Sequence, residues 1–294
     1  MTDGRDHHNS NKLTISISCV LFGHRRAQLQ EVFTALVTAI GGLAENAEVD
    51  ASLYLVDNKA RPGEHSELCE DLITWINSND LFTQVHSIVG QGNVGFGVGH
   101  NMALNKTDSD FHIILNPDVW VARSSLIEGV KYLRAHSDVA MVAPAAREMN
   151  GDTQYIAKRY PSVLILWLRA FAPEFIRRKF LPSMHHYELR DRIPANKPLD
   201  IKIASGCFML ARTSTLKDVG GFNPVFFMYF EDYDLCQRLV SQRQKIVHLP
   251  QMQIVHTGGG AARKGVRHVG YFISSAIKFF NRHGWRWFLV RDEN

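Results

Sequence analysis

An apolar strand followed by an amphipathic helix occurs four times between residues 13 and 136, and this repeat constrains the fold more than any other feature. Each strand-like run is rich in β-branched and apolar residues, whereas the segment after it places apolar residues at helical spacing. The strand runs are 13–22, 51–58, 82–89 and 111–121, and the helical segments are 27–40, 66–76, a stretch that starts after the glycines near 96, and 125–136. Because neighbouring parallel strands need crossover connections, the repeat predicts an α/β fold with a doubly wound, mostly parallel sheet.

The regular rhythm ends near residue 147. Residues 160–198 hold five of the ten prolines, which predicts an insertion or a lid rather than another strand and helix. Beyond it, the apolar patterns predict strands in 201–212 and 245–256 and a final amphipathic helix in 268–282.

Composition excludes several classes of protein. A formal net charge of +4 over 294 residues is too small to indicate a nucleic-acid-binding protein. The four cysteines form no C-x-x-C pair, which indicates neither a zinc site nor a disulfide framework and favours a reducing compartment. The first dozen residues lack the apolar core of a secretory signal, and the apolar run 163–168 is far shorter than the ~20 residues that span a bilayer. We therefore expect a soluble or peripherally membrane-bound protein.

Two aspartates directly follow predicted strands, Asp57 in LVDN and Asp118 in LNPD. Ligands of an open α/β sheet bind beyond the carboxyl ends of the strands, so the two positions together predict a shared site. The alternative is that Asp57 with Asn58, and Asn116 with Asp118, only form turns, since these residue types are frequent turn formers.

A pair of acids, Glu231 and Asp232, follows the five bulky residues 226–230. Acids in this position are expected at the lip of a cleft, where burial raises the proton affinity of a carboxylate enough for it to act as a base. Alternatively, the acids complement the dipole at the N-terminus of the helix that follows, and both roles can hold at once.

His256 ends a predicted strand and precedes the glycines at 258–260. Glycines there would allow a backbone segment or a diphosphate to approach the histidine closely. A structural histidine is the alternative.

Residues 90–95 spell G-x-G-x-x-G, the fingerprint of dinucleotide-binding Rossmann folds, and Asp118 lies at nearly the expected spacing beyond it. An NAD-dependent oxidoreductase is therefore an alternative function. However, these glycines follow the third predicted strand rather than the first, and this function would leave Glu231, Asp232 and His256 unused.

Taken in order, the motifs resemble those of glycosyltransferase family 2, particularly its bacterial rhamnosyltransferase-like branch, which builds O-antigen lipopolysaccharide and other surface polysaccharides. The stretches that carry the resemblance are VDN at 56–58, GNVGFGVGHN at 92–101, LNPDV at 115–119, SGCFMLAR at 205–212 with 220–236, and IVHTGGG at 254–260. The resemblance implies a GT-A fold, a Rossmann-like sheet that binds a nucleotide-sugar together with Mg²⁺ or Mn²⁺.

The resemblance also divides the chain. We expect a disordered tail over 1–12, a donor-binding half over 13–147, an acceptor-binding and catalytic half of the same domain over 148–260, and a basic, aromatic helical region over 261–294.

Matching the motifs residue by residue assigns roles that the resemblance implies. Asp57 corresponds to the acid that contacts the nucleoside and Asp118 to the metal-binding acid, while His256 corresponds to a histidine that completes the metal's coordination in some relatives. The family's D-x-D motif reads Asn116-Pro117-Asp118 here, so its first carboxylate is missing. Asp232 corresponds to the catalytic base, with Glu231 as the nearest alternative. The remaining donor-binding residues implied are Asn93, Gly95, Phe96, Gly97, Asn101 and Asn116.

The branch resemblance favours dTDP-L-rhamnose as the donor and a saccharide, often lipid-linked at the cytoplasmic leaflet, as the acceptor. Segments 163–192 and 261–294 mix basic and aromatic residues, which suits an anionic membrane surface and predicts a cytoplasmic protein bound peripherally to the inner face of the cell membrane. A solvated helix face or a homodimer contact is the alternative for these segments. A non-catalytic sugar-nucleotide-binding protein is a further alternative function, against which the acids at 118 and 232 argue.

Overall fold

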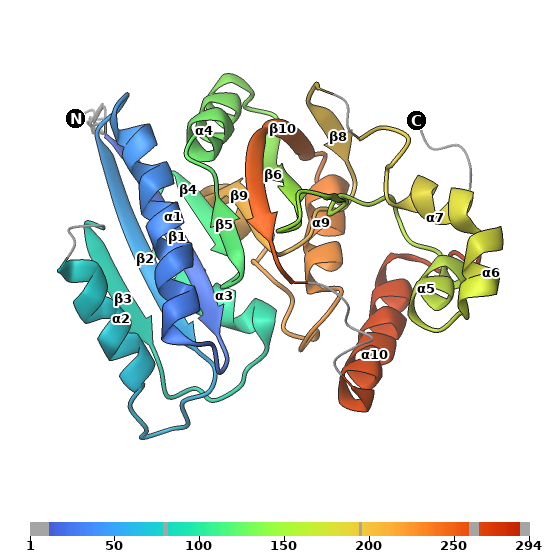
Figure 1. Ribbon diagram of the computed structural model, residues 1–294, viewed down its shortest axis with the longest axis horizontal. Coiled ribbons are helices and arrows are strands. Elements are labelled where there is room, and N and C mark those ends of the chain that lie inside the picture. The colour runs from blue at the N-terminus through green and yellow to red at the C-terminus, as the bar shows by residue number, and fades with distance from the viewer. Residues whose placement is uncertain (1–11, 79–81, 194–195, 259–264, 289–294) are drawn as a thin grey trace, which may run out of the picture.

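The computed structural model describes residues 12–78, 82–193, 196–258 and 265–288 (Figure 1). Its strands form one sheet in the order β3-β2-β1-β4-β9-β6-β10-β5, with β7 beside β6 and β8 beside β10. The strands are β1 (Leu13–Leu21), β2 (Val49–Asp57), β3 (Gln84–Ile88), β4 (Phe111–Leu115), β5 (Val119–Val121), β6 (Val139–Arg147), β7 (Thr153–Gln154), β8 (Leu199–Ile201), β9 (Phe208–Arg212) and β10 (Lys245–His256). The helices are α1 (Arg26–Ala44), α2 (Glu67–Asn77), α3 (Phe96–Leu104), α4 (Ser125–Ala135), α5 (Val163–Ala170), α6 (Glu174–Lys179), α7 (Leu181–Tyr187), α8 (Thr213–Asp218), α9 (Glu231–Ser241) and α10 (Val266–His283).

The predicted parallel sheet is confirmed for β3, β2, β1 and β4, which all run parallel and are joined by helices. Beyond β4 the sheet is mixed, because β9 runs antiparallel to both β4 and β6, and β5 runs antiparallel to β10. The single strand expected over 111–121 is two strands, since the chain turns at Asn116–Asp118 and β5 pairs elsewhere in the sheet. This turn places Asp118 between the two strands.

Alternate strand residues supply two apolar cores, one on each face of the sheet. Ile113, Val142 and Leu210 face the core beneath α1, α2 and α4, whereas their neighbours Ile114 and Met141 face the core beneath α3 and α9. Figure 1 shows the two groups of helices on opposite sides of the sheet.

Helix α1 is long and apolar enough to cross a membrane by length and composition. In the structure, however, its Leu29, Phe33 and Leu36 are fully buried in the core under the sheet. It therefore serves as a core helix of this domain.

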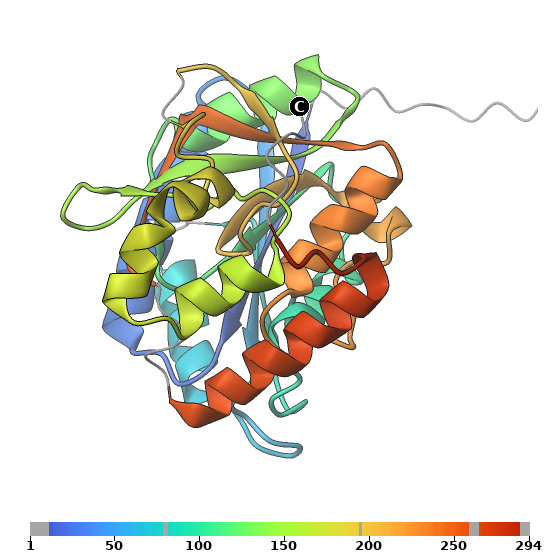
Figure 2. The same cartoon turned by 90° about the vertical axis from the view of Figure 1, so that its right-hand side faces the viewer.

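The proline-rich segment predicted as an insertion folds into the short helices α5, α6 and α7. They lie beside α10, the predicted C-terminal helix, at one end of the molecule (Figure 2). Residues 1–11 of the tail predicted over 1–12 lie outside the described residues, as do 259–264 and 289–294, which include parts of the C-terminal region predicted over 261–294.

Candidate active site

Asp118 and His256 meet at the edge where β5 pairs with β10. In this antiparallel register His256 lies opposite Val119, the residue after Asp118. The Nε2 atom of His256 lies 3.5 Å from Oδ1 of Asp118, and the backbone N–H of Thr257 donates to the Asp118 carbonyl at 3.2 Å. The two predicted metal ligands are thus neighbours in space although far apart in sequence.

Gln154, which the sequence reasoning missed, orients His256. The Nδ1 atom of His256 lies 2.7 Å from Oε1 of Gln154, and Nε2 of the same amide donates to the Gly258 carbonyl at 3.0 Å. Since the amide oxygen only accepts, Nδ1–H donates to it, which leaves Nε2 on the side that faces Asp118. No sequence signal marked Gln154, because its position depends on the two-residue strand β7 pairing with β6.

The arrangement suits a divalent cation. A Cβ added to Gly258 would lie 2.3 Å from Oδ2 of Asp118 and 2.6 Å from Nε2 of His256, so the glycine leaves open the space in front of both side chains. Carboxylate oxygen and imidazole nitrogen are both suitable ligands for such ions. Among the described residues no group of three or more His, Cys, Asp or Glu gathers, so further ligands would have to come from substrate phosphates or water.

The acid pair Glu231 and Asp232 opens α9 after a strained turn. Tyr229 and Phe230 both adopt the left-handed backbone, with φ of 68° and 65°, a conformation that costs non-glycine residues of order 1–3 kcal/mol each and is frequent at functional sites. The turn places both acids in the first turn of α9, where their charges complement the helix dipole as expected. This position does not prevent them from also facing a cleft.

The two acids have different surroundings. Asp232 accepts hydrogen bonds from the backbone N–H of Gly206 and of Tyr233, each at 2.9 Å. Burial raises the pKa of Asp232, and these backbone donors partly offset that rise. Glu231 is buried, and its Oε2 has no hydrogen-bond partner within the described part of the chain. Burial and then the nearby Asp232 raise the pKa of Glu231 well above 4.5.

The Asp118–His256 pair and the acid pair lie at one end of adjacent strands. The backbone N–H of Asn116 donates to the carbonyl of Cys207 at 2.9 Å, which joins the turn after β4 to the segment before β9. Burial raises the pKa of the Cys207 thiol to about 12, and the carboxylates of Asp118 and Asp232 both add to this rise. A cavity of about 460 Å³ is lined by residues of both pairs, including Glu231, Asp232, His256 and Gly258.

Asp57 makes local hydrogen bonds of the kind expected if it only forms a turn with Asn58. Its two carboxylate oxygens accept from the backbone N–H of Lys59 at 2.8 Å and from the Ser66 hydroxyl at 2.6 Å. Ser66 in turn caps α2. The side chain therefore fixes the β2–α2 connection, and its predicted contact with a nucleoside stays a prediction.

Two glycines at the start of α3, Gly95 and Gly97, are needed for packing, and their predicted contact with the donor stays a prediction. Gly95 has φ of 88°, and a Cβ there would lie 2.3 Å from the carbonyl oxygen of Phe227. A Cβ on Gly97 would lie 2.6 Å from Cβ of Phe222. These glycines let α3 approach the 222–227 segment closely.

The amides of this loop are also engaged within the protein. Asn93 accepts from the backbone N–H of Gly95 at 3.2 Å. Asn101 donates to the Phe222 carbonyl at 2.7 Å and accepts from its N–H at 2.8 Å, so it holds α3 to the segment around Phe222, and its predicted contact with the donor stays a prediction.

Phe96 and Asn116 both contact the 206–207 segment, which binds Asp232. The Phe96 ring packs against Gly206, whose N–H holds Asp232. Asn116 has a buried Oδ1 with no hydrogen-bond partner in the described ranges, so it keeps an acceptor at the strand end.

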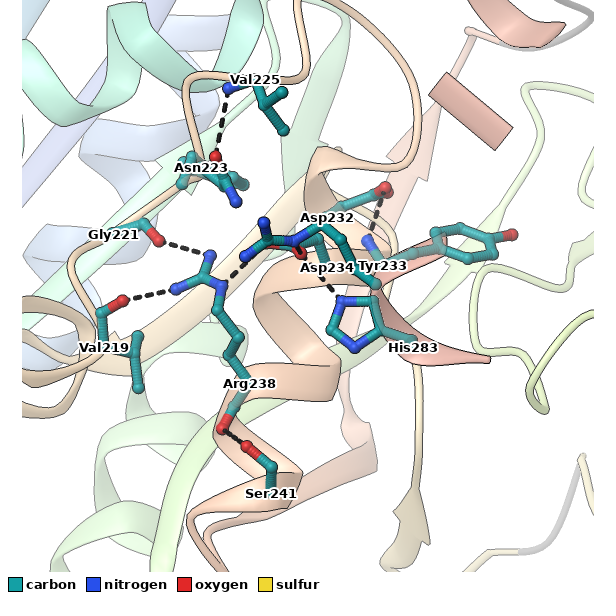
Figure 3. Close-up of polar contacts among 12 residues, drawn as sticks. Val219, Gly221, Asn223, Val225, Asp232, Tyr233, Asp234, Arg238, Ser241 and His283 are labelled. Carbon is teal, nitrogen blue, oxygen red and sulfur yellow. Dashed lines mark hydrogen bonds and ion pairs between the residues drawn. The ribbon is translucent and has the colours of Figure 1, made fainter. Parts of the chain in front are cut away.

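Asp234, two residues after Asp232, is the centre of a buried ionic network that the sequence did not reveal. Its carboxylate accepts from Arg238 at 2.7 Å and His283 at 2.8 Å, with Arg282 at 3.3 Å (Figure 3). Arg238 also donates to carbonyls of the 219–221 turn. The network ties α10 and this turn to the helix that carries the acid pair.

A sequence profile of the family described as "Glycosyl transferase family 2" matches residues 30–220. The chain belongs to this family. Family membership favours a glycosyltransferase over the alternative of an NAD-dependent oxidoreductase. The packing contacts of Gly95 and Gly97 explain these glycines without a dinucleotide fingerprint.

Two curated proteins illustrate which family members are similar to this chain. Rhamnosyltransferase WbbL of Escherichia coli (strain K12) is 27% identical over 179 residues, which cover 57% of this chain and 62% of that protein. N-acetylglucosaminyl-diphospho-decaprenol L-rhamnosyltransferase of Mycobacterium tuberculosis is 26% identical over 209 residues, which cover 65% and 67%. The match thus spans about three fifths of the length of WbbL.

Solved structures share the fold. GalNAc-T7 with UDP, GalNAc and Mn²⁺ has a TM-score of 0.65 at 14% identity, over 93% of this chain and 48% of that one. Mannosyltransferase PcManGT from Pyrobaculum calidifontis, in complex with GDP-Man and Mn²⁺, has a TM-score of 0.57 at 15% identity, over 90% and 64%. The predicted GT-A fold is confirmed.

Proposed function

We propose that this chain is an inverting, metal-dependent glycosyltransferase that moves a sugar from a nucleotide-sugar donor to a saccharide acceptor. One observation carries the proposal: a single cavity is lined both by the acid pair, Glu231 and Asp232, and by His256, which lies beside Asp118. Transfer needs these two kinds of group on either side of the reacting carbon, one to stabilise the leaving diphosphate and one to accept a proton.

Asp118 and His256 are the residues that would hold Mg²⁺ or Mn²⁺. Such a cation, when bound, neutralises charge on the departing nucleoside diphosphate. Gln154 fixes the His256 ring so that Nε2 stays available, as hydrogen-bond partners of metal-binding histidines do. Asn116 offers a neutral oxygen in the position of the missing first carboxylate of the D-x-D motif.

Asp232 is the base in this proposal. It would accept the proton of the acceptor hydroxyl as that oxygen attacks the anomeric carbon, and a single displacement of this kind inverts the configuration. The two backbone N–H groups that bind Asp232 hold its carboxylate in one orientation, and general-base assistance is typically worth ~10² to 10⁴-fold. Glu231, with a more strongly raised pKa, is the nearest alternative.

We favour L-rhamnose from dTDP-L-rhamnose as the transferred sugar, because two curated relatives are named rhamnosyltransferases. Thermal-shift measurements with dTDP, UDP, GDP and NAD, each with and without Mn²⁺, test this choice, since a ligand that binds only the folded state raises its apparent stability. Greater stabilisation by dTDP with Mn²⁺ is expected. Stabilisation by NAD alone would overturn the function, whereas stabilisation by UDP or GDP with Mn²⁺ would overturn only the donor.

We further propose that the acceptor is a lipid-linked saccharide and that the protein acts in the cytoplasm on the inner face of the cell membrane, in O-antigen or related synthesis. The support is a surface formed by the 163–192 helices and the C-terminal segment. Its exposed apolar side chains are Trp167, Phe171, Phe175, Phe180, Leu181, Ile273, Ile277, Trp285, Trp287 and Phe288. Basic residues 177–179 and Lys278 belong to the same helices. Flotation with anionic vesicles at low salt should retain the protein, and failure to float, or dimerisation through this surface, would contradict membrane binding.

A further inference from the structure

The turn before the acid pair needs contacts from outside to hold it. Tyr229 and Phe230 both adopt the left-handed backbone, and a strained conformation of this kind persists only where the surrounding structure fixes it. The two residues directly precede Glu231 and Asp232, which open α9. Contacts that fix the turn therefore also position the acid pair.

Two hydrogen bonds join the turn to α10. The Ser275 hydroxyl donates to the Met228 carbonyl at 2.8 Å, and Ser275 is only 3% exposed. The hydroxyl of Tyr229 lies 2.9 Å from Nδ1 of His268, near the start of the same helix. Because Ser275 is buried, breaking its bond would leave a hydroxyl without water to replace the carbonyl, and this cost opposes movement of the turn away from α10.

Aromatic rings of α10 fix the second strained residue. Phe230 is buried, and its ring centre lies 5.2 Å from that of Phe272 and 5.4 Å from that of Phe279. The ring of Tyr233, the residue after Asp232, lies 5.1 Å from Phe230 and 5.9 Å from Phe279. A movement of Phe230 would open a gap among these rings, which a close-packed interior resists.

Helix α10 also holds the chain on both sides of the turn. Before the turn, Nζ of Lys278 donates to the Val225 carbonyl at 2.9 Å. After it, Nε2 of His283 lies 2.8 Å from Oδ1 of Asp234 (Figure 3). The helix therefore contacts the segment from 225 to 234 at both ends and in the middle.

The position of the turn affects the proposed base through α9. Asp232 accepts from the backbone N–H of Gly206 at 2.9 Å, a bond between two separate segments of the chain. The turn sets where α9 begins, so a shift of the turn would move Asp232 relative to Gly206. Since hydrogen bonds weaken steeply when they are misaligned, such a shift would release the carboxylate from the orientation that this bond fixes.

We propose that α10 is a positioning element of the active site, in which Ser275 and His268 hold the strained turn so that Glu231 and Asp232 face the cavity. The inference rests on the proposed function in one respect, since it takes Asp232 as the base. It gives the inner face of α10 a role in turnover, separate from the membrane contact proposed for its exposed side chains.

The first test needs no substrate. Hydrogen–deuterium exchange, followed by mass spectrometry of peptides, compares wild type with Ser275→Ala, Tyr229→Phe and Ser274→Ala. The first two variants each remove one hydrogen bond to the turn, so amides within 226–236 should exchange about 2- to 10-fold faster. Ser274 is the exposed neighbour of Ser275 on the same helix, so Ser274→Ala is the matched control and should exchange like wild type.

The second test separates positioning from binding. Ser275 lies outside the set of described residues that line the cavity, so any effect of Ser275→Ala on turnover must pass through the turn. Release of nucleoside diphosphate from dTDP-L-rhamnose with Mn²⁺ should show a kcat about 3- to 10-fold lower, because a base that is displaced meets its substrate less often in the reactive geometry. The calorimetric Kd of the donor should stay as in wild type, since the proposed donor contacts are at Asp118 and His256.

Three outcomes would overturn the inference. The first is unchanged exchange within 226–236 in variants that melt like wild type. The second is faster exchange spread evenly over the chain, which would make these bonds general stabilisers of the fold. The third is a donor Kd that weakens as much as kcat falls.

Melting temperatures identify a variant that fails to fold, and Tyr229→Phe carries the exchange test if Ser275→Ala is such a variant. A wild-type protein that releases no nucleoside diphosphate would contradict the proposed function instead. The exchange experiment decides separately whether α10 holds the turn, because it is made without substrate.

Discussion

The Asp234 network predicts a large and specific loss of stability on substitution. Asp234 is fully buried, and its carboxylate is the shared partner of Arg238, His283 and Arg282. Asp234→Asn keeps the shape of the side chain but removes its charge, and it places an amide N–H group against at least one cationic donor. The substitution thereby leaves buried positive charge uncompensated.

The magnitude follows from the burial of the partners. Breaking a buried ion pair by removing one partner costs about 3–5 kcal/mol. The side chains of Arg238 and His283 are 19% and 16% exposed, whereas Arg282 is 47% exposed and reaches water. We therefore expect the lower end, about 3 kcal/mol, which corresponds to a fall in melting temperature of roughly 6–12 °C.

Differential scanning calorimetry of Asp234→Asn beside Asp138→Asn measures this effect. Asp138 also pairs with a basic residue, Lys245 at 2.7 Å, but both side chains are more than half exposed, so its loss should lower the melting temperature far less than the loss of Asp234. If the two variants melt within experimental error of each other, the buried network does not stabilise the packing of α10 on α9.

Three other predictions concern the site itself. Gln154→Ala should weaken Mn²⁺-dependent nucleotide binding about 10- to 100-fold by calorimetry, because the His256 ring loses its partner, whereas Gln84→Ala, which removes an exposed Gln–His contact, should not. Gly95→Ala should lower the urea midpoint more than Gly92→Ala, since both have positive φ but only a Cβ at 95 would collide with neighbouring backbone; equal midpoints would refute the packing argument. The pKa of Glu231 is raised in the folded protein, so the free energy of unfolding of the wild type falls as pH rises from 4.5 through that raised pKa. Glu231→Gln should therefore be more stable relative to the wild type at about pH 8 than at about pH 4. The same difference in stability at both pH values would contradict this prediction.

The sequence predicted the half of the fold that local patterns specify. Strands and helices up to residue 136 follow apolar periodicity, and β1 to β4 pair in parallel as expected. The mixed half could not be predicted in this way, because β9 lies between β4 and β6 through pairing between distant segments. Similarly, the apolar run over 111–121 gave no sign that β5 would leave β4 to pair with β10.

The site was predicted in part. Asp118 and His256 are neighbours as the family motifs implied, and Glu231 and Asp232 lie in the expected cavity. Gln154 and Asp234 were missed because their importance comes from burial and from partners far along the chain, which composition and spacing do not reveal. The sequence also gave no sign that Asn101 would bind both backbone groups of Phe222, because these residues are far apart along the chain.

The central claim, base-assisted transfer from a nucleotide-sugar, is tested most directly by one comparison. Release of nucleoside diphosphate from dTDP-L-rhamnose with Mn²⁺ is measured for wild type and for Asp232→Asn, alongside calorimetric binding of the donor to both. We expect donor binding that is nearly intact in the variant and release that falls by ~10² to 10⁴-fold. Near-normal release from Asp232→Asn would remove Asp232 from the role of base and contradict the account.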